Sequence, residues 1–106
     1  MNMNEYQKPA LVTCGSYGVP MRIMSALGLA GESGEVCDLV KKHLFHDHEL
    51  NQYAFEKELG DVLWYLAVLA HAYGLDLEQV AQTNIAKLRK RYPSGFDTER
   101  SKNRKE

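Results

Sequence analysis

A chain of 106 residues can hold one domain with a single hydrophobic core and is too short for two. With 44% hydrophobic and 25% charged residues, its composition is that of an ordinary globular protein, which excludes a disordered or fibrous chain. The longest apolar run, 62–70, is about half of the ~20 residues that a membrane span requires. The polar first residues are unlike a signal peptide, so we expect one domain over 1–106, cytoplasmic and away from membranes.

The formal net charge of -1 hides an asymmetry along the chain. Residues 1–85 carry five Lys or Arg against eleven Asp or Glu, whereas residues 86–106 carry eight against three. A basic end of this kind is usually a solvated surface, so we expect 97–106 to be a flexible basic tail and do not expect nucleic acid as a partner. Cys14 and Cys37 lack the CxxC spacing of a zinc site, and we expect both to be reduced thiols.

The first two segments predicted as helices flank a connection that contains glycine and proline. Residues 4–17 are weakly amphipathic, and Pro9 predicts an interruption or a loose first turn there. Residues 21–45 follow, with apolar side chains at helical spacing. This second helix contains the run GLAGESGE at 28–35, although each glycine costs a helix up to ~1 kcal/mol relative to alanine. We expect the small residues of this run to let a facing helix approach closely.

The third segment gives the clearest helix, because the apolar residues of 52–73 fall on one stripe at ~100° per residue. A fourth helix is predicted after Asp76, a plausible N-cap, and should end near Tyr92, before a proline. Four helices joined by short connections, without strands, predict an all-α antiparallel helical bundle. Between residues 59 and 73 the third helix is apolar all round, so we expect a homodimer or homotetramer to complete the bundle.

Two pairs of acids share a three-residue spacing: Glu32 with Glu35, and Glu58 with Asp61. Residues three apart lie on one helical face, and antiparallel helices can bring the two pairs opposite each other. Four converging carboxylates repel one another unless a cation neutralises them, and hard oxygen ligands suit Mg²⁺, with Mn²⁺ as a substitute. The alternative is that each pair belongs to a solvated helix face, which is common for a single Glu-x-x-Glu.

The fourth helix carries a polar line formed by Asn84, Lys87 and Arg91 at positions i, i+3 and i+7, and Tyr92 follows at its end. One amide and two cations suit phosphate oxygens beside a metal site. The alternative is an exposed basic helix end that interacts favourably with its own dipole.

Three blocks of the sequence, GLAGESGEV, KELGDVLWYLAVLA and NIAKLRKRYPSGF, resemble the MazG-like nucleotide pyrophosphohydrolases, which are all-α enzymes related in fold to the dimeric dUTPases. The resemblance covers about residues 27–96, whereas the first helix matches no motif. It implies hydrolysis of a nucleoside triphosphate between the α and β phosphates, giving the monophosphate and pyrophosphate. It also implies four Mg²⁺ ligands, Glu32, Glu35, Glu58 and Asp61, and three residues that meet the triphosphate, Asn84, Lys87 and Arg91.

The expected mechanism follows from charge, because Mg²⁺ neutralises phosphate oxygens and lowers the pKa of a bound water that attacks phosphorus in line. Either Glu32 or Glu35 would orient or deprotonate that water. Stacking on the base is expected from aromatic side chains, with Trp64, Tyr73 and Tyr92 as the candidates. For Trp64 and Tyr73, packing in the core or in an oligomer is an equal alternative. A different class of function is a non-catalytic, metal-binding helical module with a regulatory or interaction role.

Overall fold

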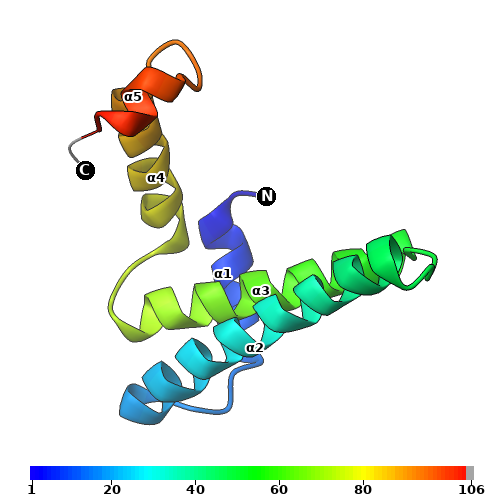
Figure 1. Cartoon of the computed structure of the whole chain (residues 1–106). Coiled ribbons are helices and arrows are strands. Elements are labelled where there is room, and N and C mark those ends of the chain that lie inside the picture. The colour runs from blue at the N-terminus through cyan, green and yellow to red at the C-terminus, as the bar shows by residue number, and fades with distance from the viewer. Residues whose placement is uncertain (105–106) are drawn as a thin grey trace.

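The computed structural model describes residues 1–104 and consists of helices and short connections (Figure 1). The helices are α1 (Met3–Val12), α2 (Gly18–Phe45), α3 (Gln52–Ala72), α4 (Leu77–Arg91) and α5 (Thr98–Lys102). Within these residues there is no strand, only an isolated bridge between Pro93 and Gly95, so the prediction of an all-α fold with about four substantial helices is confirmed. None of the helices in this part of the chain combines the length and the apolar character needed to cross a membrane.

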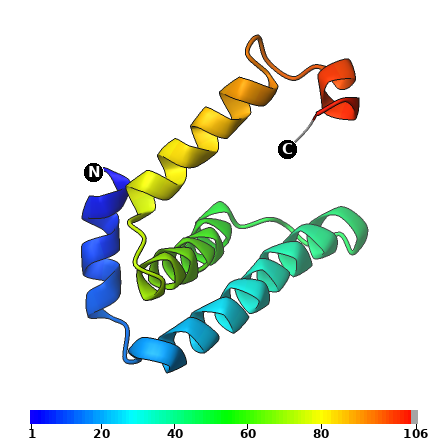
Figure 2. The ribbon, with the colours of Figure 1, turned by 90° about the vertical axis from the view of Figure 1, so that its left-hand side faces the viewer.

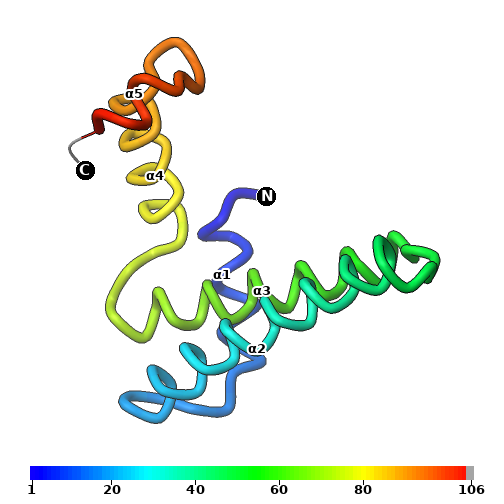
Figure 3. Tube along the Cα trace, viewed as in Figure 1, coloured from blue at the N-terminus to red at the C-terminus, as the bar shows by residue number. Residues whose placement is uncertain are grey.

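The α2–α3 hairpin is the centre of the fold, and the two helices run side by side in opposite directions (Figure 3). Its buried core lies toward the start of α2, where Met21 meets Val68 of α3 and Cys14 of the preceding loop. Ser25 is also fully buried, and its hydroxyl donates to the carbonyl oxygen of Met21 at 2.6 Å, so no unsatisfied polar group enters this interface. The packing of α2 against α3 is therefore the framework on which the other helices are placed.

Helix α1 crosses the hairpin and is fixed to α3 by Trp64. The indole N–H of Trp64 donates to the carbonyl oxygen of Ala10 at 3.1 Å and to the hydroxyl of Thr13 at 2.8 Å. The sequence predicted an interruption or a loose first turn at Pro9, but α1 is continuous through that residue. Pro9 has no amide N–H to donate to the carbonyl of Glu5 four residues earlier, and Glu5 is exposed to solvent, where water can satisfy that carbonyl.

Helix α4 is attached to the rest of the chain at its N-terminus. Asp76 is its N-cap, as predicted, and its carboxylate accepts from the Gln79 amide at 2.7 Å. Two side chains of α1 satisfy further amides at this end: Gln7 accepts from Leu77 and Asn4 accepts from Glu78, both at 3.0 Å. Beyond this attachment α4 leads away from the hairpin in Figure 1, and in the orthogonal view of Figure 2 it runs in a similar direction to α2 but apart from it. The four main helices of one chain therefore do not close into a complete bundle.

The end of the chain contains a helix that the sequence analysis did not predict. Residues 97–106 were expected to form a flexible basic tail, yet Asp97 caps the short helix α5 by accepting from Glu99 and Arg100. The Arg100 guanidinium in turn donates to the carbonyl oxygen of Arg91 at 2.7 Å, at the end of α4. Residues 105–106, the last part of the expected tail, lie outside the described residues.

A first prediction concerns Gln7, which is 6% exposed and joins three segments. Its amide nitrogen donates to the carbonyl oxygens of Ala67 at 3.0 Å and Leu75 at 3.4 Å, while its oxygen caps α4. Because Gln7→Ala leaves buried backbone groups without partners, we expect a loss of about 2 kcal/mol in the free energy of unfolding. Thermal unfolding followed by circular dichroism should show a midpoint lower by roughly 10 °C.

The matched control is Gln82→Ala, which truncates an exposed glutamine on α4. It should leave the midpoint within about 2 °C of the wild-type value, since exposed substitutions rarely exceed 0.5 kcal/mol. Equal midpoints for both variants would show that Gln7 does not hold α4.

Candidate metal centre

Three carboxylates converge on the α2–α3 interface. Glu32 comes from α2, and Glu58 and Asp61 come from the facing side of α3. One oxygen of each carboxylate lies within 4.8 Å of the other two. Glu32 and Glu58 are half-buried and Asp61 is exposed, so the cluster opens to solvent on one side. The structure brings together these three of the four predicted acids, because Glu58 and Asp61 share a face of α3 and the antiparallel hairpin sets Glu32 opposite them.

The fourth predicted ligand, Glu35, is outside this group. Its side chain is exposed, and it is one turn beyond Glu32 on α2. It nevertheless contributes to the field of the cluster, because its negative charge is among the causes that raise the pKa of Glu32. Its role as a metal ligand stays a prediction.

The negative charges of the three clustered acids are not neutralised by a nearby cationic side chain within residues 1–104. Among residues 1–104 the ion pairs are those of Asp38, with Lys42 at 2.9 Å and Lys41 at 3.2 Å, and none involves the three clustered acids. The pKa of Glu32 is raised above its ordinary value, first by partial burial and then by the charges of Asp61 and Glu58 and a hydrogen bond with Glu58. A bound cation would remove this penalty.

The donor set fits a hard divalent cation. Three carboxylate groups from two helices offer oxygen ligands only, and the exposed side of the cluster leaves room for water and for further oxygen ligands. This is the ligand chemistry that Mg²⁺ and Mn²⁺ prefer, whereas zinc would favour nitrogen or sulfur.

The cluster has a neighbour on α1 that the sequence analysis missed. The pKa of the Tyr6 phenol is raised, first by partial burial and then by the negative charge of Asp61, so the phenol lies close enough to feel that charge. No signal in the sequence pointed to Tyr6, because the first helix matches no motif and its orientation depends on tertiary contacts.

The predicted phosphate-binding residues lie elsewhere on the chain. Asn84 and Lys87 are exposed and Arg91 is half-buried, all on α4, which leads away from the hairpin in Figure 1. Arg91 has a buried guanidinium nitrogen, Nε, without a hydrogen-bond partner. The ring of Tyr92 packs against Phe96 with centroids 5.3 Å apart. Within one chain the structure does not bring this group to the carboxylate cluster.

The two other aromatic candidates make contacts within the fold. Trp64 ties α3 to α1 and meets Tyr65 edge-to-face at 4.9 Å between ring centroids. Tyr73 is exposed, and its ring lies under the guanidinium of Arg22 at 4.6 Å. These contacts account for both side chains structurally, and stacking on a base stays a prediction.

Fold and site together define an all-helical protein whose antiparallel helix pair presents an acidic centre suited to a hard cation. The chain matches the family described as the MazG nucleotide pyrophosphohydrolase domain over residues 23–96, and it belongs to that family. The resemblance stated from the three sequence motifs is therefore confirmed. All residues of the metal cluster and the polar line of α4 lie inside the matched region.

Among known proteins, the Gene 37 protein of Mycobacterium phage L5 is 40% identical over 73 residues. The aligned part is 65% of this chain and 64% of that protein, so the chain spans less than two thirds of the length of this relative. The relative's name describes no activity. No solved structure matches the chain.

A second prediction concerns the pH dependence of the metal-free protein. Because the pKa of Glu32 is higher in the folded chain than its ordinary value of 4.5, the folded chain binds this proton more tightly than the unfolded chain. That contribution to stability is fully present at acidic pH and is lost as the pH rises through the raised pKa. Glu32→Gln removes the repulsion, so the metal-free variant should unfold at a higher temperature than wild type at pH 7.5.

The difference between Glu32→Gln and wild type should shrink as the pH falls toward 4, and saturating Mg²⁺ should stabilise wild type more than the variant. Glu56→Gln, which removes an exposed acid of α3 outside the cluster, is the control and should show neither trend. A wild-type chain more stable than Glu32→Gln at pH 7.5 without metal would contradict the repulsion.

Proposed function

We propose that this protein is a Mg²⁺-dependent nucleoside triphosphate pyrophosphohydrolase. It cleaves ribo- or deoxyribonucleoside triphosphates between the α and β phosphates and releases the monophosphate and pyrophosphate. The observation that carries the proposal is the convergence of Glu32, Glu58 and Asp61 inside the region matched by the family. The proposed setting is the cytoplasm, and the proposed task is control of the nucleotide pool or removal of unwanted nucleotides.

The proposed site divides the chemistry between metal and protein. Glu32, Glu58 and Asp61, with Glu35 as the fourth ligand, would hold the ion, which supplies neutralisation of phosphate oxygens and a more acidic water. The protein's own part is to orient the attacking water and accept its proton, and Glu32 or Glu35 is the proposed base. Both glutamates lie on α2 within one turn of each other, so either carboxylate is placed to take this role beside the ion.

Asn84, Lys87 and Arg91 are the proposed ligands of the triphosphate, with Lys87 and Arg91 stabilising the charge that develops on the departing pyrophosphate. Tyr92 and Trp64 are the proposed contacts of the base. Since α4 stands apart from the hairpin that carries the acids, we propose that α4 of a second copy approaches the cluster in a homodimer or homotetramer.

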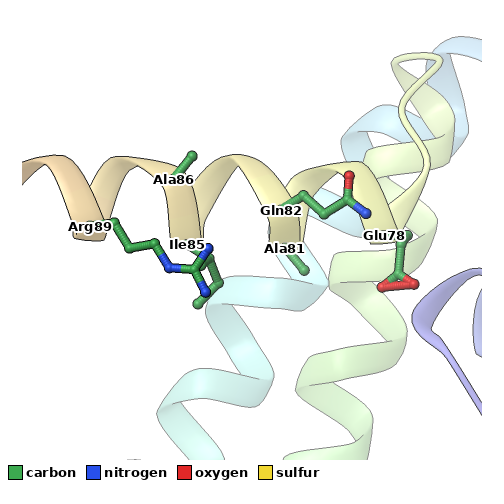
Figure 4. A pocket seen from close by; sticks show the side chains of 6 residues that line it. All are labelled: Glu78, Ala81, Gln82, Ile85, Ala86 and Arg89. Atoms are coloured by element: carbon green, nitrogen blue, oxygen red, sulfur yellow. The ribbon is translucent and has the colours of Figure 1, made fainter.

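Two features support a homo-oligomer. Large apolar side chains are exposed on three helices: Ile23 and Leu27 on α2, Leu59 on α3, and Ile85 and Leu88 on α4. A shallow hollow also runs along α4, where Glu78, Ala81, Ile85 and Arg89 project to the same side (Figure 4). An apolar surface with polar side chains at both ends is typical of an interface between subunits.

The activity is tested by incubating the protein with canonical and modified nucleoside triphosphates in Mg²⁺ and resolving the products. We expect a monophosphate and pyrophosphate, loss of turnover when EDTA removes the metal, and recovery with Mg²⁺ or Mn²⁺. A diphosphate with phosphate would contradict the assigned bond. Absence of turnover across the whole panel would favour the non-catalytic metal-binding module.

The metal centre is tested separately by Asp61→Asn, which removes an exposed ligand charge without changing side-chain volume. We expect kcat to fall more than about 100-fold with helical content unchanged, because even residues that only orient metal ligands contribute 10–100-fold. Asp38→Asn is the matched control, since Asp38 pairs with Lys41 and Lys42 away from the cluster. Near wild-type turnover in Asp61→Asn would refute the proposed centre.

A further inference from the structure

The glycine-rich run of α2 has one glycine in close contact with the facing helix. A Cβ atom added at Gly28 would lie closer than 3.0 Å to three ring carbons of Tyr65, Cδ1, Cε1 and Cζ, which real Cβ atoms essentially never show. A Cβ added at Gly31 or Gly34 would meet no heavy atom within 4 Å. The expectation that the small residues of this run allow close packing therefore applies, within one chain, to Gly28.

The ring of Tyr65 cannot easily move aside. It is half-buried, and its edge-to-face contact with Trp64 has centroids 4.9 Å apart and planes at 88°. Trp64 is itself held by hydrogen bonds to Ala10 and Thr13 of the α1 segment. The clashing atoms belong to the body of the ring and not to the end of a flexible side chain. To restore ordinary contact, α2 and the ring would have to separate by more than about 1 Å.

This contact lies one helical turn from the carboxylate cluster on both helices. Gly28 precedes Glu32 by four residues on α2, and Tyr65 follows Asp61 by four residues on α3. Residues four apart share a helical face, and the two helices are antiparallel, so the contact and the cluster are successive layers of one interface. The layers are separated by about 6 Å along the helix axis. The separation of the helices at Gly28 therefore sets the separation of Glu32 from Asp61.

We propose that Gly28 is a positioning residue: its missing side chain lets Tyr65 lie on the backbone of α2 and so brings Glu32 within metal-binding distance of Glu58 and Asp61. The inference rests on the proposed metal centre. Metal ligands must lie within about 0.2 Å of their preferred distances, so a shift of about 1 Å one turn away is enough to weaken a site. The proposal thus explains why a costly glycine occupies this position in a long helix.

The experiment compares Gly28→Ala with Gly31→Ala and Gly34→Ala, the same substitution on the same helix. Mn²⁺ binding to the metal-free protein is measured by calorimetry, helical content by far-ultraviolet circular dichroism, and the environment of Trp64, the single tryptophan of the chain, by fluorescence. Gly28→Ala should retain its helices, change the Trp64 emission and bind Mn²⁺ roughly 10–100-fold more weakly. The two controls, although nearer to Glu32 and Glu35 in sequence, should match wild type in all three measurements.

The steric cause is tested in a Tyr65→Ala background, where the ring is absent. There Gly28→Ala should cost no further Mn²⁺ affinity, because the two effects depend on one contact. If Gly28→Ala alone unfolds, the double variant is the deciding measurement. A double variant that folds and binds Mn²⁺ like Tyr65→Ala supports the proposal, whereas a double variant that unfolds overturns it. Wild-type affinity in Gly28→Ala, or equal losses in all three alanine variants, also overturns it. A wild-type chain that binds no Mn²⁺ instead refutes the metal centre and hence the proposed function.

Discussion

The repulsion among three carboxylates on the α2–α3 interface is the constraint around which this molecule is organised. Without a cation, Glu32, Glu58 and Asp61 push the two helices apart, and packing elsewhere in the hairpin has to outweigh that force. The buried core lies to one side of the acids, where Met21 and Val68 meet. The close approach at Gly28 is between this core and the cluster, so the apolar end of the hairpin holds the charged layer together.

The remaining helices are held to the hairpin by polar contacts as well as by buried apolar residues such as Ala10 and Leu77. Gln7 and Asn4 of α1 satisfy the first amides of α4, and Trp64 hydrogen-bonds to the end of α1. Because α4 is anchored at one end, its outer half keeps apolar and basic side chains exposed. A single chain therefore provides an acidic centre but does not bring its own basic helix to it. A second copy of the chain could supply that helix.

Local signals in the sequence predicted most of the helices. The features that the sequence did not predict depend on tertiary contacts or on elements too short to show a periodic pattern. Apolar periodicity and the Asp76 cap place α3 and α4 to within a residue or two, since both signals act over a few neighbouring residues. Helix α5 was missed because five residues without an apolar stripe give no periodicity, although Asp97 is a good cap. Spacing also showed which acids share a face, but not that Glu35 would lie outside the cluster. Gln7 gave no signal at all, because a buried glutamine cannot be told from a surface one in sequence.

The role of α1 has a consequence for where this domain begins. The family match starts at residue 23, after α1 has ended, and it closes at residue 96, before α5. Yet Gln7 and Asn4 cap the amides of α4, and Cys14 contributes to the core beside Met21. A fragment cut at the limits of recognisable similarity would keep every proposed metal ligand while losing the segments that close the core and hold α4. The contacts that close the core and hold α4 thus extend beyond the region that the family match covers.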